Sequence, residues 1–176
     1  MTASTLARPA DHEYAPHYAG YIARVPDGDI LAQMERQMEE TSAFLGQLEE
    51  ARGAHRYAAG KWSIKEVIGH LADGERVFAY RALRFARADA TPLASFDENA
   101  WVPQSGCDRR TLRDLAAEFR AVRMATLALA HSLTDEAATR TGVASGKTVS
   151  VRALIYMIAG HELHHLAILR ERYLQG

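Results

Sequence analysis

Four stretches of this 176-residue chain place apolar residues at every third or fourth position, the spacing of a helix with one buried face. They cover about 27–52, 63–88, 111–132 and a last stretch from Thr148 or Ser150 to the end of the chain. Alanine (32) and leucine (17) far outnumber valine plus isoleucine (15), and few β-branched residues favour helix over sheet. The pattern predicts an all-α four-helix bundle.

The chain is long enough for one domain, so we expect a single domain over 1–176. Within it, residues 1–26 have no steady period and predict an irregular arm over a bundle at 27–176. Residues 89–110 contain two prolines and a glycine and predict a long crossover or a lid. A second link is expected at 134–149.

Candidate start signals precede the four stretches. Asp27 is a suitable N-cap, Ser63 and Glu66 form a capping box, and Thr111 is an N-cap threonine. Four arginines lie on the helix predicted at 63–88, and we expect them on a solvated or acid-paired face: Arg76, Arg81, Arg84 and Arg87.

The charge balance gives no sign of a nucleic-acid or membrane partner. Lys plus Arg (21) nearly equal Asp plus Glu (22), the formal charge is -1 and the pI is about 6.7. No secretory apolar region and no run of 18 apolar residues is present. The single cysteine, Cys107, fits a reducing compartment and is expected as a surface thiol. We therefore expect a cytoplasmic protein and, since small bundles commonly pair, a homodimer.

His161 and His165 carry the strongest chemical signal. They are four residues apart on the last helix, so their rings lie about 6 Å apart on one face and can share a metal ion. Ile158 and Ile168 place this pair on an otherwise aliphatic stripe. The alternative is two buried histidines that each hydrogen-bond a backbone carbonyl. Because adjacent buried imidazoles are costly without a partner, the pair favours metal ligation.

A third ligand is needed, because open zinc-type sites usually have three protein ligands. His70 is the best candidate, since it lies on the inner side of the helix predicted at 63–88. At about 1.5 Å per residue, its height matches that of the pair only if the second and fourth helices are antiparallel. A crossover at 89–110 allows that arrangement. The other histidines lie in the arm, in a link, at a helix end or off the ligand face: His12, His17, His55, His131 and His164.

Two better-known motifs overlap this pair. His161 to His165 satisfies HExxH, in which Glu162 would be the general base of a zinc protease. Those enzymes take a further ligand downstream, and no histidine follows His165. Glu162 and His165 also form half of a di-iron carboxylate site, but the chain has no second ExxH. Neither motif is complete.

The chain resembles the DinB-like superfamily of metal-binding four-helix bundles. The matching segments are KWSIKEVIGHLADGERVFAYRALRFARAD, FDENAW, VRALIYMIAGHELHHLAILRERY and an arm that ends in RVPDGDI. The resemblance implies an up-down-down-up topology with His70, His161 and His165 as the metal ligands. It covers nearly the whole chain.

The resemblance also implies an activity, since the superfamily includes bacillithiol S-transferases and mycothiol-dependent maleylpyruvate isomerases. A divalent metal, for which we expect zinc or nickel, would activate a low-molecular-weight thiol or water toward a small-molecule substrate. Trp101 or Phe96 would then border the pocket, with the crossover as its lid. The alternative is a non-catalytic metal-binding stress or scaffold protein. An ion open to a pocket favours the enzyme, and an enclosed ion favours the scaffold.

Overall fold

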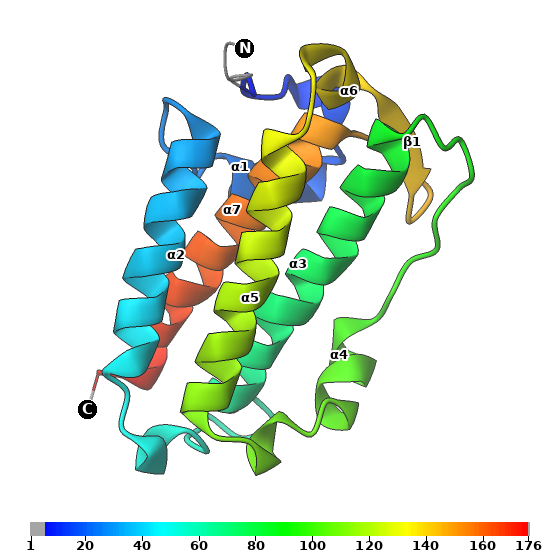
Figure 1. Ribbon diagram of the computed structural model, residues 1–176. Coiled ribbons are helices and arrows are strands. Elements are labelled where there is room, and N and C mark those ends of the chain that lie inside the picture. Colours follow the sequence, from blue (N-terminus) through cyan, green and yellow to red (C-terminus); the bar gives the residue numbers. More distant parts are fainter. Residues whose placement is uncertain (1–5, 176) are drawn as a thin grey trace.

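The computed structural model describes residues 6–175, so residues 1–5 of the predicted arm lie outside the described part. Four long helices lie side by side (Figure 1): α2 (Ile30–Gly46), α3 (Ile64–Ala86), α5 (Leu112–His131) and α7 (Val151–Ile168). A π-type turn, Leu169–Tyr173, extends α7. The all-α four-helix bundle predicted from the sequence is confirmed.

The helices run up, down, down and up. In Figure 1, α2 and α3 run in opposite directions, α5 runs alongside α3 in the same direction, and α7 returns antiparallel to both. α3 packs against α5 and α7, while α2 packs mainly against α5. The chain between α3 and α5 runs the length of the bundle, so the predicted crossover is confirmed. This topology places α3 and α7 antiparallel.

Side-chain caps explain where the helices begin. The carboxylate of Asp29, two residues after the predicted Asp27, accepts from the amide of Leu31 at 2.9 Å. Ser63 caps α3 in the predicted capping box, and Thr111 caps α5 as predicted. The last helix is capped by Ser150, the second of the two candidates.

The first long helix is shorter than predicted. It ends at Gly46, and Glu50–Arg52 form a separate 3-10 turn, whereas the periodic pattern extended to about Arg52. The reason is tertiary: the carboxylate of Glu50 accepts from the amide of Leu112 at 2.8 Å and pairs with Lys65 at 2.6 Å. These contacts hold the segment across the ends of α3 and α5.

The link at 134–149 is more ordered than predicted. It contains the short helix α6 (Asp135–Thr139) and an antiparallel hairpin of β1 (Thr141–Ala144) and β2 (Lys147–Ser150). Ser145 and Gly146 form its two-residue turn, both with positive φ (52° and 71°), as such tight hairpin turns require. Leu93 of the crossover forms a parallel bridge to Ala144, so the hairpin anchors the crossover.

Short helical turns also occur in the segments expected to be irregular. The arm contains 3-10 turns at Asp11–Glu13 and Pro16–Tyr18, followed by α1 (Ala19–Ile22), which packs against α7. The crossover contains α4 (Glu98–Trp101) and 3-10 turns at Val102–Gln104 and Cys107–Arg109. Cys107 is buried, so the expectation of a surface thiol is wrong.

A polar layer divides the core. One apolar cluster includes Met34, Phe78 and Leu154, and another includes Ile64 and Leu166 near the opposite ends of the helices. The polar layer between them comprises Thr41, His70, Glu75, Arg123, His161, Glu162 and His165, all buried. Burying polar groups costs free energy unless they find partners. The contacts within this layer are therefore informative about function.

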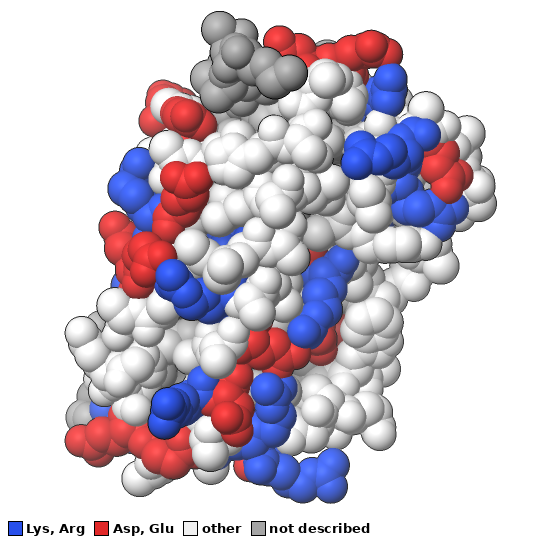
Figure 2. All heavy atoms as spheres, viewed as in Figure 1, with Lys and Arg blue, Asp and Glu red and all other residues white. Residues whose placement is uncertain are grey.

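The surface mixes both charges. Figure 2 shows Lys and Arg side chains interspersed with Asp and Glu over the face drawn. Among the described helices, none combines the length and apolar character needed to cross a membrane.

Candidate metal centre

The structure brings His70, His161 and His165 together. Their ring centroids lie 4.8 Å (His70 to His161), 4.8 Å (His70 to His165) and 4.6 Å (His161 to His165) apart. One nitrogen from each ring lies within 4.8 Å of the others, so the three could hold one metal ion. The other histidines of the described chain lie outside this cluster.

The backbone makes room for these rings. Gly74 lies one turn after His70 on α3, and a Cβ there would lie 3.0 Å from Cε1 of His161. Gly160 lies on α7 beside His161, and a Cβ there would lie 2.0 Å from the carbonyl oxygen of Tyr21. Two missing side chains thus let α3 approach the imidazole and the arm approach α7.

The contacts of the ring nitrogens fit a shared metal ion better than they fit buried histidines that are fully hydrogen-bonded. Nε2 of His70 and Nε2 of His161 are 2.9 Å apart, near the roughly 3.4 Å between two nitrogens on one tetrahedral zinc ion. Nδ1 of His165 is buried and has no hydrogen-bond partner among the described residues. An unmet buried polar atom costs about 1–3 kcal/mol. A shared ion would bind the lone pairs of ring nitrogens, including one such as Nδ1 of His165 that the described protein leaves without a partner.

Burial keeps the three imidazoles neutral, the form that binds metal. It lowers the pKa of His70 to about 4 and that of His165 to about 3. The pKa of His161 also lies well below its ordinary value, first because of burial and then because of the neighbouring histidines. All three side chains are therefore unprotonated at neutral pH.

Aromatic side chains enclose the histidines. The ring of Tyr21 lies 5.4 Å from that of His161, and the ring of Trp62 lies 4.7 Å from that of His70. Phe78 meets His161 edge-on at 6.0 Å. These contacts fix the orientation of the imidazoles and limit access of bulk water.

The rings open onto a pocket of about 340 Å³. Arm, crossover, hairpin and the two antiparallel helices all contribute to its wall. The lining residues are His17, Tyr18, Tyr21, Trp62, His70, Phe78, Phe96, Glu98, Ser145, His161 and His165. Phe96 borders the pocket as predicted, whereas Trp101 stacks behind it at 5.0 Å and is not a lining residue.

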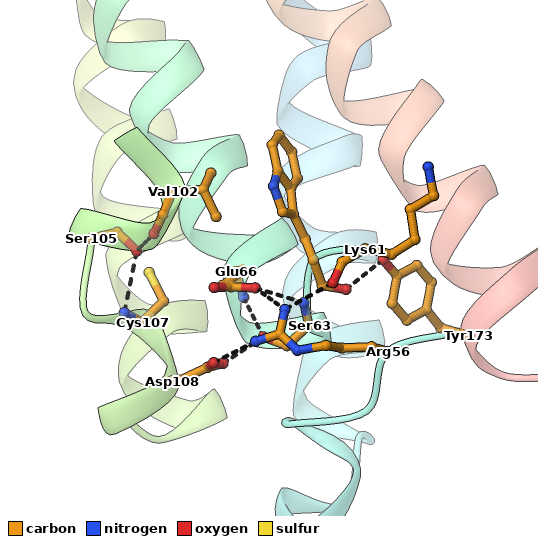
Figure 3. Close-up of polar contacts among 10 residues, drawn as sticks. Arg56, Lys61, Ser63, Glu66, Val102, Ser105, Cys107, Asp108 and Tyr173 are labelled. Carbon is orange, nitrogen blue, oxygen red and sulfur yellow. Dashed lines mark hydrogen bonds and ion pairs between the residues drawn. The ribbon is translucent and has the colours of Figure 1, made fainter. Parts of the chain in front are cut away.

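A hydrogen-bond network holds the segment that carries Trp62. Figure 3 shows Arg56 joined to Glu66, to Asp108 and to the carbonyl of Lys61 at the start of α3. The hydroxyl of Tyr173 donates to the carbonyl of Trp62 at 2.7 Å. Burial raises the pKa of Tyr173 to about 12, so this hydroxyl keeps its proton. Trp62 is thereby held where its ring covers His70.

Glu162 belongs to a different set of contacts. Its carboxylate pairs with Arg123 at 2.7 Å and accepts from the hydroxyl of Thr41. Arg123 also donates two hydrogen bonds of 2.8 Å to Glu75. Because Glu162 does not line the pocket, it is not placed as the base of an HExxH protease.

One arginine departs from the expected solvated or acid-paired face. Arg81 is buried (3% exposed), and its guanidinium donates to the carbonyl of Ala94 at 2.9 Å and to the hydroxyl of Ser145 at 3.0 Å. No acidic partner of Arg81 is present among the described residues. The expectation is therefore wrong for Arg81, which instead ties the crossover to the hairpin at the pocket.

A larger hollow lies elsewhere, on the surface between α2 and α5. Its volume is about 720 Å³, and Glu39, Met124 and His131 are among its lining residues. Charged side chains and the apolar side chains of Met38, Met124 and Leu127 line it together. The candidate metal centre is distinguished from this hollow by three converging histidines rather than by pocket size.

Comparison with known families agrees with this geometry. The model of the DinB superfamily matches residues 33–169. The chain belongs to the DinB superfamily. The match includes all three histidines of the candidate centre.

Relatives in this superfamily carry names that refer to metal. A protein of Oceanobacillus iheyensis is 24% identical over 139 residues, covering 78% of this chain and 79% of its own length. One from Bacillus pumilus is 28% identical over 147 residues and covers 81% of each chain. Both bear the name "putative metal-dependent hydrolase".

Two solved structures share the DinB fold. YfiT from Bacillus subtilis, described as "a probable metal-dependent hydrolase with an unusual four-helix bundle topology", superposes with a TM-score of 0.70 at 17% identity, over 94% of this chain and 90% of its own. The mycothiol-dependent maleylpyruvate isomerase superposes with a TM-score of 0.64 at 16% identity. That match covers 82% of this chain and 61% of the isomerase.

The sequence did not reveal several residues of the site. His17, Tyr18 and Tyr21 come from an arm without periodicity, and Ser145 comes from a hairpin expected to be a link. Asp97, which caps α4, was a usable local signal for this short helix. It gave no sign that the next residue, Glu98, lines the pocket.

Proposed function

We propose that this chain is a metal-dependent enzyme in which His70, His161 and His165 bind one divalent ion, zinc or nickel, and the adjoining pocket admits a small-molecule substrate. The observation that carries the proposal is the opening of the three ligands onto the 340 Å³ pocket. A purely structural ion needs no such pocket. The names of the superfamily relatives support the same class of function.

The donor set supports activation of a nucleophile. Three neutral imidazoles leave the full charge of a divalent ion uncompensated, and a three-ligand site keeps at least one position for an incoming group. A divalent ion there would lower the pKa of a thiol or of water and so supply a nucleophile near neutral pH. The proposed first choice is a low-molecular-weight thiol, as in S-transfer, with hydrolysis as the second.

The surrounding side chains have definite tasks in this proposal. Tyr21 and Trp62 hold the imidazoles of His161 and His70 in place and exclude bulk water. The crossover, through Phe96 and Glu98, supplies the wall facing the histidines. Glu162 has no catalytic task, because its contacts are with Thr41 and Arg123.

Cobalt substitution tests the proposal. Titration of the full-length cobalt protein with cysteine, glutathione and coenzyme A should produce a thiolate-to-cobalt charge-transfer absorption with at least one of them, and His161→Ala should abolish it. If no thiol changes the spectrum, thiol activation is wrong. Release of product from activated esters by the zinc protein would then support hydrolysis, and absence of both responses would support the scaffold alternative.

A further inference from the structure

Glu98 is the one acidic residue among the described residues that line the histidine pocket. It lies on α4 in the crossover, where its side chain is partly buried. The carboxylate makes no hydrogen bond or ion pair within residues 6–175. The fold therefore does not use this charge, although the neighbouring Asp97 caps α4 with hydrogen bonds to Asn99 and Ala100.

Aromatic faces surround the same space. Tyr18, Tyr21 and Phe96 line the pocket with Glu98, and Trp62 and Phe78 line it nearer the histidines. The face of an aromatic ring is negative and attracts cations, a contribution of about 0.5–2 kcal/mol that grows as the site loses water. A carboxylate among such rings complements an organic cation.

Glu98 and the three histidines line the same pocket, and Tyr21 lines it with them. The ring of Tyr21 lies 5.4 Å from that of His161. A molecule in contact with the histidines is thus within reach of the charge of Glu98.

The buried cation of the crossover side, Arg81, is not among the residues that line the pocket. Arg81 lies against Phe96, with its guanidinium carbon 5.6 Å from the ring centroid. Its guanidinium donates to the carbonyl of Ala94 and the hydroxyl of Ser145, and it also interacts with the hydroxyl of Tyr18. Among the described residues that line the pocket, Glu98 is therefore the charged carboxylate that a ligand would meet.

We propose that the pocket selects substrates that carry an ammonium group, with Glu98 as the counter-charge and Tyr18, Tyr21 and Phe96 as the surrounding walls. This assignment rests on the proposed function. The sulfur of the bound thiol would lie at the histidines, and the ammonium group at the other end of the same molecule would lie at Glu98. Such a molecule is negative at one end and positive at the other, as the pocket requires. A carboxylate in place of the ammonium would be repelled by Glu98.

Matched thiols test this selectivity without an activity assay. The full-length cobalt protein is titrated with ω-aminoalkanethiols, ω-hydroxyalkanethiols and ω-mercaptocarboxylates of two to six carbons, and binding is followed by the charge-transfer absorption. At the chain length that spans the pocket, the aminothiol should bind about five- to tenfold more tightly than the hydroxythiol, as expected for one partly exposed ion pair plus cation–π contacts. The mercaptocarboxylate should bind most weakly.

Variants of Glu98 show whether this side chain determines which class of thiol binds most tightly. Glu98→Gln should abolish the preference, so that the aminothiol and the hydroxythiol bind about equally tightly. Glu98→Lys should bind the mercaptocarboxylate most tightly. Glu40→Gln removes the same charge from an exposed position on α2 and should leave the preference unchanged. Unchanged cobalt d–d spectra establish that the metal centre is intact in each variant.

The outcomes separate the two proposals. Equal binding of amino- and hydroxythiols at every chain length by the unaltered protein, or an ammonium preference that survives in Glu98→Gln, would overturn the role of Glu98 while leaving thiol activation in place. No absorption with any thiol of the three series would reject thiol activation itself, and the selectivity with it.

Discussion

Glu162 and Arg123 meet inside the bundle, with 2.7 Å between carboxylate and guanidinium. His161, the preceding residue of α7, instead contacts His70 at the pocket. Two consecutive side chains thus have different roles: His161 belongs to the candidate metal centre, and Glu162 joins α7 to α5. The HExxH pattern in the sequence therefore does not describe one catalytic unit in this fold.

The first prediction concerns Glu162→Gln. The amide oxygen can accept from Arg123 while the amide nitrogen donates to the hydroxyl of Thr41, and Arg123 keeps its two hydrogen bonds to Glu75. We expect the variant to retain its metal stoichiometry and its thiol binding, measured by elemental analysis and by the thiol titration. A folded Glu162→Gln protein without metal would show that this carboxylate acts at the centre after all.

Replacing Arg123 should be far more damaging. The guanidinium is fully buried and is the cation that pairs with both Glu75 and Glu162, so Arg123→Gln leaves two buried carboxyl groups without a cation. We expect a loss of about 3–5 kcal/mol in the free energy of unfolding, measured by urea denaturation. Arg120 lies on α5 like Arg123, but it is only half-buried and pairs with Glu39 of α2 at the surface. Arg120→Gln should therefore cost about 1 kcal/mol or less. Equal losses would contradict the buried cluster.

Gly74→Ala tests the space around His161. The added Cβ would lie 3.0 Å from Cε1 of the imidazole, so the ring has to move by a few tenths of an ångström. We expect the zinc dissociation constant to rise about tenfold in competition with a chelating dye, because ligand geometry is strict. Gly46→Ala, whose Cβ would meet nothing within 4 Å, should leave zinc affinity unchanged. Unchanged affinity in Gly74→Ala would remove His161 from the ligand set.

Acid should destabilise the metal-free protein. Unfolded histidine titrates near 6.5, whereas His70 and His165 have folded pKa values of about 4 and about 3 because of burial. Between these pKa values the unfolded chain binds more protons than the folded chain. The free energy of unfolding is therefore highest above about pH 6.5 and decreases as the pH falls. At pH 5 the loss is about 2 kcal/mol per histidine.

Urea denaturation of metal-free protein at pH 7.5 and pH 5 measures this loss. His165→Leu should reduce the pH dependence, while His12→Asn, a change in an exposed residue of the arm, should not. A stability of the metal-free protein that is independent of pH over this range would mean that the imidazoles are not buried as described.

The helices and the histidine cluster were predictable because each rests on a local pattern. Apolar spacing located the four helices, and two histidines on an aliphatic stripe marked the face that His70 completes. The boundary at Gly46 was not predictable, because the contacts of Glu50 with Leu112 and Lys65 depend on the assembled bundle. The hairpin left a usable signal, a Ser145–Gly146 turn between short β-branched segments.

Buried charge was the least predictable feature. Arg81 and Arg123 look like ordinary surface arginines in a helical pattern, yet both are inside the protein. The position of Arg123 makes sense only once Glu75 from α3 and Glu162 from α7 are seen on either side of it. Likewise, an aperiodic arm cannot reveal from sequence that Tyr21 covers His161.

The most direct test of the metal centre is elemental analysis of the protein purified without an affinity tag, alongside alanine variants of the histidines. We predict about one divalent ion per chain in the unaltered protein, sharp loss of that metal in His70→Ala, His161→Ala and His165→Ala, and full retention in His164→Ala. His164 is the matched control, because it lies on the same helix and contacts Tyr21 without joining the cluster. An unaltered protein that binds no divalent ion, or equal loss of metal in His164→Ala, would contradict the account.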